Sequence, residues 1–426
     1  MMQDSRTLVD HFFRHEYGRL VAVLTRSLGI RNLELVEDVV QSSLSKALVT
    51  WRTNGIPDDP AAWLFRTSRN LAIDAIRRTQ TEHRLLSSKL LAPETRDEVA
   101  NQTVHFAEEV GDESLRLLFL CCHPNIPLES SIAFALKTVS GFSTDEVSSA
   151  LLITRANAEK RITRAKERLR EIGTEITELD NAALESRIDA VQSTIYLVFN
   201  EGYASSGGHT TLRKDLCEEA IRLALMLVAS VPSVATSSCA LLALMLMHSA
   251  RFDARVDMHG SVVLLKDQDR SRWDWNRIRE ALDWMSKSAD GTRLSRYHVE
   301  AAIAWEHCRA ESFDEIDWSM IAVHYKCLQR IHSSPMVRLN LAIALSYSSS
   351  PEIGLTFLSD IVKEDRTRLR PWWDCAMADV LSRMGNFEDA ISHWQDALLL
   401  ASNPDQRELI AKQIAQAKNK KATPSK

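Results

Sequence analysis

The stretch TRANAEKRITRAKERLR, residues 154–170, predicts a basic amphipathic helix on which the interpretation of the whole chain depends. Thr154 suits the N-cap position, because its hydroxyl can accept a hydrogen bond from a backbone N–H of the first turn. Helical spacing gathers one narrow apolar stripe, made of Ala158, Ile162, Ala165 and Leu169. Lys160 and Arg164 point the opposite way, Arg161 and Arg168 lie on the flank, and Asn157 sits near the same face in the first turn.

The preceding segment, residues 141–153, predicts a short capped helix from Ser143 to about Leu151, followed by a brief turn. A helix, a tight turn and a basic helix form the helix-turn-helix arrangement, whose second helix enters the DNA major groove. The alternative is a solvated surface helix, since many such helices are rich in Arg and Lys. The short capped helix directly before it favours DNA binding.

Composition predicts an almost entirely helical, all-α protein. The 426 residues include only 13 glycines and 11 prolines, and periodic apolar runs of helical length recur throughout. This length predicts about two to four domains. The formal net charge is -5, so bulk charge does not indicate nucleic-acid binding, and any DNA-binding surface must be confined to particular helices.

The sequence also predicts a cytoplasmic location. The seven cysteines are odd in number and mostly lie in apolar helical runs, which fits free thiols in a reducing compartment. The start of the chain carries Asp4, Arg6 and Asp10 without the apolar core of a signal peptide. The longest apolar run, Cys239 to Met247, is too short to span a bilayer.

Two helices are expected before residue 52, over residues 6–28 and from Leu33 to Trp51. The second helix has two distinct sides. Its exposed side is expected to carry the acidic and amide residues Glu34, Glu37, Asp38 and Gln41, and its inner side carries Leu35, Val39, Leu44, Ala47 and Leu48. A loop dense in helix breakers follows at residues 53–60.

A third helix, from Pro60 to about Arg78, combines an apolar side with an unusual polar side. The buried side comprises Leu64, Phe65, Leu71, Ala72, Ala75 and Ile76. The opposite side aligns one aromatic ring, cations and an amide at helical spacing: Trp63, Arg66, Asn70, Asp74 and Arg77. Such a line can grip phosphates and stack on unpaired bases. The alternative is that Trp63 packs on a neighbouring helix while the arginines are solvated.

The C-terminal part predicts further helices and then helix pairs. Helices are expected at residues 185–199, 212–229 and 235–250, and Pro335 and Pro371 begin two repeats 36 residues apart. The second repeat follows the tetratricopeptide spacing at Gly385, Phe387, Ala390, Trp394, Ala397 and Leu398, and in the first repeat Gly354 and Leu358 take the places of Ala390 and Trp394. Residues 297–330 are a candidate for a further, degenerate repeat. Such arrays leave a concave face for a peptide or another domain.

Three polar clusters are candidate sites with a structural alternative. The segment 264–274 contains Asp267, Asp269, Arg270 and Arg272, which could form an enzyme site with an aspartate as general base. The alternative, which we favour, is a buried ion network that clamps two helical units. Asn200, Glu201 and Tyr203 are interpreted as a polar helix end. Cys121-Cys122-His123 is a weak zinc motif, because no second cysteine pair accompanies it.

Three motifs resemble regions 2 and 4 of the sigma-70 family: Glu37–Gln41, Trp63–Arg78 and Gly141–Arg170. The absence of region 3 resembles the extracytoplasmic-function class, and the C-terminal part, including residues 267–274, is similar to the group with a tetratricopeptide-like helical extension. Two features depart from the usual pattern of the class: the segment around Cys121–Pro124, and the long continuation of the chain.

The resemblance implies three surfaces. The Glu37, Asp38 and Gln41 face is expected to meet the coiled coil of the polymerase β′ subunit. Residues 52–59 with Trp63, Arg66, Asn70 and Arg77 are expected to capture the opened minus-10 element. The minus-35 duplex is expected to be read by Asn157, Lys160, Arg161 and Arg164.

We therefore expect sigma region 2 at residues 1–79, a linker at 80–111, region 4 at 112–175, a helical extension at 182–290 and helical repeats at 291–418. The expected function is that of an alternative sigma factor rather than an enzyme, with no metal or small cofactor. The expected partners are core RNA polymerase and promoter DNA, with a peptide, a protein or the chain's own sigma domains on the repeats. The alternatives are a helix-turn-helix regulator that never joins polymerase, and an enzyme with a site around Asp267, Asp269 and Arg270.

Overall fold

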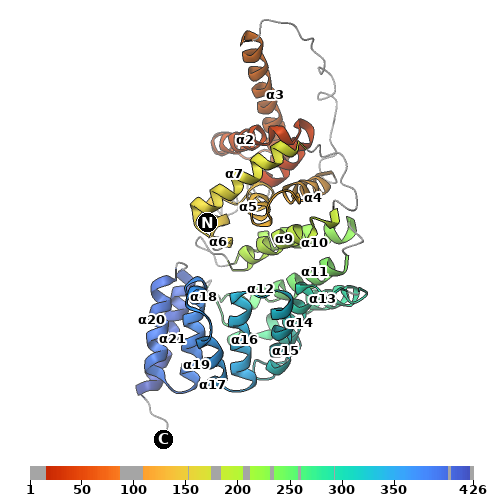
Figure 1. Ribbon diagram of the computed structural model, residues 1–426. Helices are drawn as coiled ribbons and strands as arrows, with labels where there is room; N and C mark the ends of the chain where they lie inside the picture. Colours follow the sequence, from red (N-terminus) through yellow and green to blue (C-terminus); the bar gives the residue numbers. More distant parts are fainter. Residues whose placement is uncertain are drawn as a thin grey trace. The chain divides into compact units, whose positions relative to one another are not determined.

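The computed structural model describes residues 16–86, 109–151, 153–173, 184–204, 212–230, 235–257, 261–291, 293–401 and 404–422 (Figure 1). Its secondary structure over these ranges is helical, apart from turns and one isolated antiparallel bridge between Val256 and Val262. The predicted all-α class is confirmed. None of the helices in the described ranges has the length and apolar character that a bilayer crossing requires.

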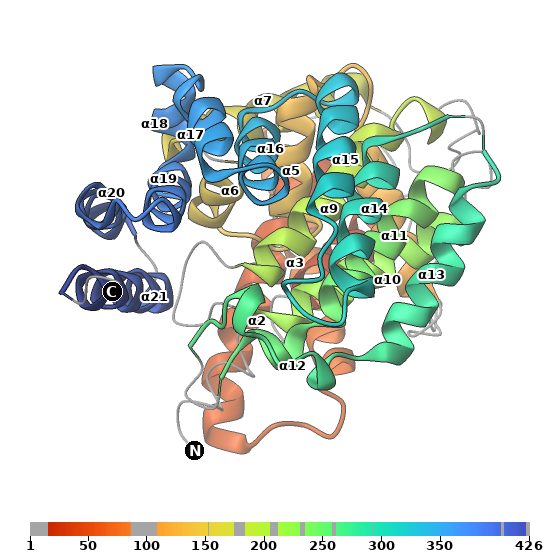
Figure 2. The same ribbon diagram turned by 90° about the horizontal axis from the view of Figure 1, so that it is seen from below.

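The chain forms two compact units, residues 1–195 and 196–426, and helix α9 (Ile188–Tyr203) begins in the first and ends in the second. Figure 2 shows the same helices from a second direction. The half of the predicted 6–28 helix that precedes residue 16, and residues 87–108 of the predicted linker, lie outside the described residues.

The first unit begins with a helix over residues 16–28, the short η1 (Ile30–Asn32), α2 (Leu33–Asn54) and α3 (Pro60–Leu86). Helices α2 and α3 pack against each other, and a buried hydrogen bond of 2.6 Å joins the hydroxyls of Ser43 and Ser68. Helix α3 continues past the predicted end at Arg78, because residues 79–86 contain neither Gly nor Pro to stop it. Leu48, expected on the inner side of α2, is 52 % exposed. It lies beside the buried stripe of α2, not within it.

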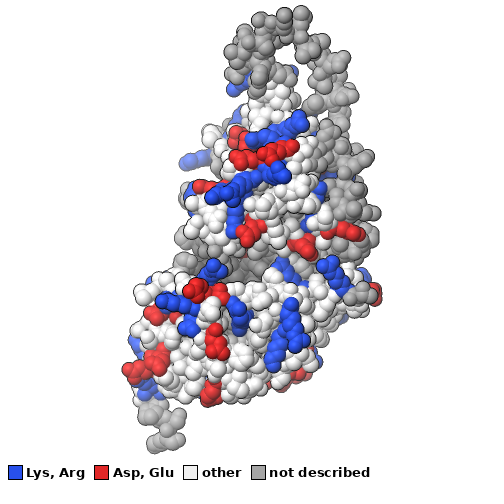
Figure 3. Space-filling view, in the orientation of Figure 1, with Lys and Arg blue, Asp and Glu red and all other residues white. Residues whose placement is uncertain are grey.

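Four more helices complete most of the first unit: α4 (Glu109–Cys121), α5 (Leu128–Thr138), α6 (Thr144–Ala150) and α7 (Arg155–Ile172). The predicted caps are present. The Ser143 hydroxyl accepts from the backbone N–H of Glu146 at 3.2 Å, and the Thr154 hydroxyl accepts from that of Asn157 at 3.3 Å. All four residues of the predicted apolar stripe on α7 are buried. On the face of this unit that carries α7, basic side chains alternate with acidic ones (Figure 3).

The second unit starts with the end of α9, α10 (Lys214–Ser230), α11 (Ala235–Ser249) and the short α12 (Phe252–Arg255). Two single turns, η3 (Leu265–Asp267) and η4 (Arg270–Arg272), lead into α13 (Trp275–Ser288). Helix α11 packs against α10, α13 and α14 (Arg296–Arg309). Its residues from Cys239 to Met247 are all buried, which explains why its sequence is apolar all round.

Helix pairs occupy the rest of the second unit. Helix α14 packs on α15 (Trp318–Ile331), α16 (Pro335–Ser348) on α17 (Pro351–Ser359), and α19 (Trp372–Arg383) on α20 (Phe387–Leu400). The last helix, α21 (Pro404–Ala422), packs on α20, and a seven-residue helix that was not predicted, α18 (Lys363–Leu369), precedes α19. The three pairs begin near the predicted repeat starts.

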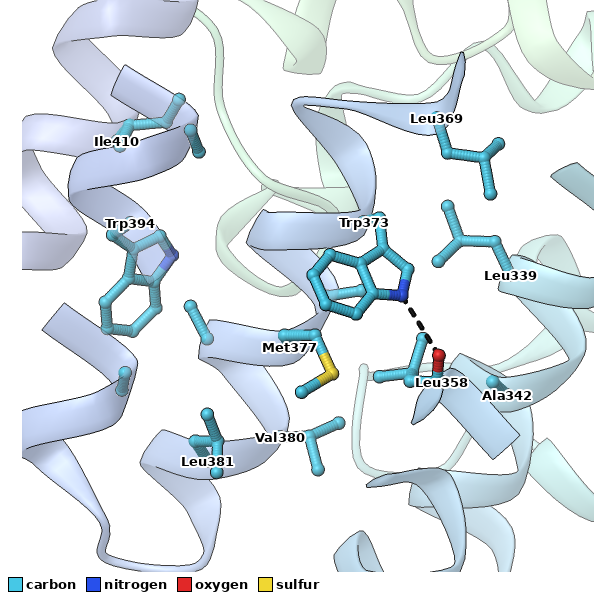
Figure 4. Packing of buried hydrophobic residues seen from close by; sticks show 14 of the residues in the cluster. Leu339, Ala342, Leu358, Leu369, Trp373, Met377, Val380, Leu381, Trp394 and Ile410 are labelled. Atoms are coloured by element: carbon cyan, nitrogen blue, oxygen red, sulfur yellow. Dashed lines mark hydrogen bonds between the residues drawn. The ribbon is translucent and has the colours of Figure 1, made fainter. Parts of the chain in front are cut away.

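Trp373 and Trp394 anchor the core of the last helix pairs (Figure 4). The indole N–H of Trp373 donates to the carbonyl of Leu358 at 3.0 Å, so α19 is tied to the end of α17. Ala390 and Leu358 are fully buried, as the repeat spacing predicts. At Gly354, an added Cβ would lie 2.2 Å from the Cβ of Ser346, so this glycine permits the close approach of α17 to α16.

We predict that Gly354→Ala destabilises the second unit. Replacing a helical glycine by alanine normally stabilises by about 0.5 to 1 kcal/mol. Overpacking a tight interface costs about 1 to 3 kcal/mol, which is the larger effect here. Thr356→Ala, at an exposed position of the same helix, serves as the control in urea unfolding followed by circular dichroism. A higher unfolding midpoint for Gly354→Ala would contradict the close packing of α16 and α17.

Candidate nucleic-acid interface

The exposed face of α7 carries most of the residues predicted to read duplex DNA. Asn157, Lys160 and Arg164 are exposed, and neither Lys160 nor Arg164 forms an ion pair within the described part of the chain. Arg161 differs, because it is only half-exposed and pairs at 2.5 Å with Glu129 on α5. Lys160, Arg164 and Asn157 are therefore accessible to DNA on this face. The fourth predicted residue, Arg161, is held in an ion pair within the protein.

A surface ion pair joins α6 to α7. Arg155 donates to both carboxylate oxygens of Asp145 on α6, at 2.9 and 3.1 Å, and to Glu159 on its own helix at 3.0 Å. Helices α6 and α7 also pack against each other, and Val147 of α6 and Ala158 of α7 are buried. A short helix followed by a basic helix is the order of elements that the sequence predicts for residues 143–170.

The polar line of α3 lies at the surface of the first unit. Arg66, Asn70 and Arg77 are exposed, and Trp63 is half-buried. The Trp63 ring meets the Trp51 ring edge-on, with centroids 5.5 Å apart. The predicted alternative is therefore realised in part: Trp63 rests on α2, but one portion of its ring stays accessible beside an exposed arginine and amide. Asp59 caps this helix by accepting from the backbone N–H of Ala62 at 2.9 Å.

The predicted exposed acidic face of α2 needs a correction at Glu37. Asp38 and Gln41 are exposed, but Glu37 is only 6 % exposed. Its carboxylate accepts from the Thr138 hydroxyl of α5 at 2.9 Å and pairs with Lys166 of α7. The helical pattern of α2 could not reveal that Glu37 is buried, because the residues that cover it belong to α5 and α7, which are distant in the sequence.

Other contacts join the same parts of the first unit. Glu34 of α2 pairs with Arg170 of α7 at 2.8 Å. Gly18 lies so close to α5 that an added Cβ would be 1.8 Å from the carbonyl oxygen of Val139. Burial, reinforced by Glu37, raises the pKa of the neighbouring Tyr17 hydroxyl well above its usual value. In this conformation, α2 and the helix over residues 16–28 pack against α5 and α7.

The cysteine motif does not assemble a metal site. Cys121 and Cys122 are buried, and burial raises the pKa of the Cys122 thiol to about 12, so both sulfurs stay protonated. Across the described ranges, the residues that come together with metal-ligand spacing are Asp374, His393 and Asp396. Arg370 pairs with Asp374 and Asp396, so a guanidinium already occupies the position of a cation there.

The polar segment 264–274 does not present a poised general base. Asp267 and Asp269 are both exposed. The Ser271 hydroxyl and its backbone N–H donate to Asp269 at 2.7 and 3.0 Å, which lowers the pKa of this carboxyl. Arg270 donates to the carbonyls of His307 and Ala310 at the end of α14. The segment clamps two helical parts, as expected, but through carbonyl groups rather than through an ion network.

Residues 12–82, which include α2 and most of α3, match sigma-70 region 2, so the first unit begins with a domain of sigma-70 transcription factors. Residues 187–289 match a family of unknown function. An uncharacterized protein of Rhizobium meliloti (strain 1021) is 36 % identical over 404 residues, which span 93 % of this chain and 94 % of the relative. The chain belongs to the same family as that protein, and it carries a sigma-70 region 2. No solved structure matches it.

We predict that Lys166→Met destabilises the first unit more than Lys160→Met does. Removing Lys166 leaves the buried Glu37 carboxylate with only the Thr138 hydroxyl, and a lost hydrogen bond to a charged group costs about 1.5 to 3 kcal/mol. Lys160 lies on the exposed face of the same helix and serves as the matched control. Equal unfolding midpoints for the two variants would show that the buried pair does not hold α2 and α7 together.

Proposed function

We propose that this protein is an alternative sigma factor of the extracytoplasmic-function class, which binds core RNA polymerase and initiates transcription at promoters with minus-10 and minus-35 elements. The observation that carries the proposal is the match of residues 12–82 to sigma-70 region 2, in a unit that also contains a helix-turn-helix with an exposed basic face. The proposed activity is cytoplasmic, requires no cofactor and involves no bond-making chemistry by the protein itself.

The line on α3 suits capture of unpaired bases. Half-exposed Trp63 offers a ring for stacking, which contributes about 1 to 3 kcal/mol per base in single-strand complexes. Arg66 and Arg77 supply charge for phosphates, and Asn70 supplies both a hydrogen-bond donor and an acceptor. Trapping unpaired bases compensates the unstacking of the duplex, which costs a few kcal/mol per step. In this proposal, α3 with the 52–59 loop holds the opened minus-10 strand.

The face of α7 suits the minus-35 duplex. Lys160 and Arg164 are exposed cations near Asn157, and Arg and Asn side chains make specific contacts with guanine and adenine edges in the major groove. Arg161 can contact DNA only after its ion pair with Glu129 is broken. Region 4 of the sigma factor is thus assigned to the helix-turn-helix, within the predicted limits 112–175.

Asp38 and Gln41 form the accessible part of the proposed polymerase surface, which we assign to the coiled coil of the β′ subunit. Glu37 belongs to the same surface but is covered by Lys166 and Thr138. Complete engagement of polymerase therefore requires α5 and α7 to move away from α2. The same separation lets the two DNA-binding faces reach two promoter elements at once.

The second unit is proposed to regulate the first. Its helix pairs, α14 to α20, support a tetratricopeptide-like array with a surface for a peptide, a partner protein or the chain's own sigma domains. A helix-turn-helix regulator that never joins polymerase is the second candidate function, favoured by the basic face of α7. The exposed, hydrogen-bonded Asp269 counts against the enzyme alternative.

We predict that Lys160→Ala and Arg164→Ala weaken binding to promoter DNA without lowering stability. Loss of one base contact costs about 1 to 3 kcal/mol, or roughly five- to a hundredfold in affinity. The measurement is fluorescence anisotropy of the polymerase holoenzyme on a duplex promoter at fixed salt. Lys363→Ala, an exposed lysine of the second unit, controls for net charge. If both α7 variants bind like this control, the major-groove assignment is wrong.

We predict that Asp38→Arg reduces capture of core polymerase by about tenfold, because like charges brought together across an interface oppose binding. The assay is a pull-down of purified core enzyme by the tagged full chain. Asp360→Arg, an equal charge reversal at an exposed position of the second unit, is the control. Capture that is insensitive to both substitutions would favour the regulator that acts without polymerase, provided that the variants still bind DNA.

A further inference from the structure

Three arginines converge around Trp273 and Tyr203 in the second unit. Arg251 precedes α12, Arg255 ends it, and Arg270 begins η4. The guanidinium carbons of Arg270 and Arg251 lie 4.5 and 5.3 Å from the centroid of the Trp273 ring, and that of Arg255 lies 3.9 Å from the Tyr203 ring. Trp273 is 3 % exposed and Arg251 8 %. We call Arg251, Arg270 and Trp273 the arginine cluster.

Local backbone contacts hold Trp273 in this position. The backbone N–H of Asp274 donates to the carbonyl of Ala250 at 2.8 Å, which joins the segment to the end of α11. The Asp274 carboxylate then caps α13 by accepting from the N–H groups of Asn276 and Arg277 at 3.0 and 3.1 Å. The indole ring is therefore built into the fold, next to both cations.

The guanidinium groups of the cluster are held by neutral oxygens, and the exposed Glu315 attracts Arg270 only from beyond ion-pair distance. Arg251 donates to the amide oxygen of Gln268 at 3.2 Å, and Arg270 donates to the carbonyls of His307 and Ala310 at 2.8 and 2.7 Å. Over the described ranges, Arg251, Arg255 and Arg270 form no ion pair with a carboxylate. Arg251 is buried and Arg270 is half-buried. Burying a charge without a paired opposite charge is costly, so the fold leaves here an unmet preference for an anion.

The nearby aspartates do not meet this preference. Asp269 accepts from Ser271, Asp274 caps α13, and Asp253 pairs with Lys214 at 2.7 Å. The acidic residues that the sequence places beside Arg270 are therefore either engaged elsewhere or, in the case of Asp267, exposed.

Several hydrogen-bonding atoms of the cluster and its neighbourhood are buried without a partner. Within the ranges that the structure describes, these atoms are Nη2 of Arg270, Nε1 of Trp273, Nε of Arg255 and Nδ1 of His307. Three of them are donors, since guanidinium and indole nitrogens do not accept. Native proteins leave few buried polar groups unpaired, and each costs about 1 to 3 kcal/mol. Hydrogen-bond donors without a partner, next to arginines without an ion-paired carboxylate, are features of an oxyanion site.

The neighbouring arginines also affect the pKa values of two buried histidines, His307 and His248. Burial, with Arg251 and Arg270 adding to it, lowers the pKa of His307 to about 3. Burial and the same kind of repulsion, from Arg251 and Arg255, lower the pKa of His248 to about 3. Both rings are neutral at physiological pH, so the positive charge of the site comes from the arginines.

We propose that Arg251, Arg270 and the indole N–H of Trp273 bind a small oxyanion, the carboxylate or phosphate group of a ligand, in the second unit. Guanidinium groups suit both, because their planar N–H donors match carboxylate and phosphate oxygens. The site lies partly in the segment 187–289, whose family has no assigned function, and His307 extends it onto α14. The proposal does not depend on the sigma-factor assignment of the first unit.

The test is isothermal titration of the full chain with inorganic phosphate and, separately, with acetate, each against chloride at matched ionic strength. Trp273→Phe removes the N–H but keeps an aromatic ring, and Arg251→Gln removes one charge but leaves Arg270 on the carbonyls of α14. Arg272→Gln removes an equal charge from an exposed neighbour and is the control. Circular dichroism of each variant establishes that it is folded.

We expect saturable binding of phosphate or acetate to the wild type and to Arg272→Gln, weakened at least about tenfold in both cluster variants, equivalent to about 1.4 kcal/mol. The anion that binds more tightly identifies the class of ligand. Absence of saturable binding of either anion overturns the proposal. So does equal binding by wild type and a folded Trp273→Phe, because the N–H then has no role. If Arg251→Gln does not fold, Trp273→Phe alone decides.

Discussion

The buried carboxylate of Glu37 links three helices of the first unit. It lies on α2, yet its partners are the Thr138 hydroxyl of α5 and the ammonium group of Lys166 on α7. A buried charge that lost these contacts would carry a large desolvation cost, so the three helices stay together as long as it is covered. Glu34 and Arg170 add a second, exposed pair along the same line. Helix α2 of the sigma-70 region 2 match is thereby packed against α5 and α7. This packing restricts the movement of α7, the proposed DNA-binding helix, and covers part of the proposed polymerase surface on α2.

Among its described residues, the second unit contains charged groups both with and without an ion-pair partner. Its helices associate through apolar packing around Trp373 and Trp394 and through close approach at Gly354. Near its beginning, however, Arg251 and Arg270 are held against Trp273 by amide and carbonyl oxygens alone. Such contacts orient the guanidinium groups but leave their charge unbalanced. The second unit also contains a buried anion with its cation, because Asp374 pairs with Arg370. Arg251 and Arg270, in contrast, form no ion pair with a carboxylate of the described ranges.

The positions of most helices could be predicted from the sequence, because apolar periodicity and capping residues are local. Ser143 and Thr154 cap α6 and α7 as expected, and the stripe from Ala158 to Leu169 is buried. Exposure of individual polar residues was predicted correctly for Lys160, Arg164, Arg66 and Asn70. The predicted exposure of Glu37 was wrong, and Arg161 proved to be engaged by Glu129. Both depend on helices that are distant in the sequence, so no local pattern could show them.

The sequence by itself determined the all-α class, the positions of most helices, and the burial of Gly354 and Ala390 in the later helix pairs. These features follow from the spacing of apolar side chains along one helix and from the backbone needs of its ends. Only the tertiary structure decided which charged residues are covered and which stay available, because that depends on the neighbour each side chain meets. The helical pattern around Glu37 and the polar segment around Arg270 do not reveal which charges are covered. The burial of Glu37 beside Lys166, and the placement of the half-buried Arg270 on carbonyl groups of another helix, arise only when separate helices pack together.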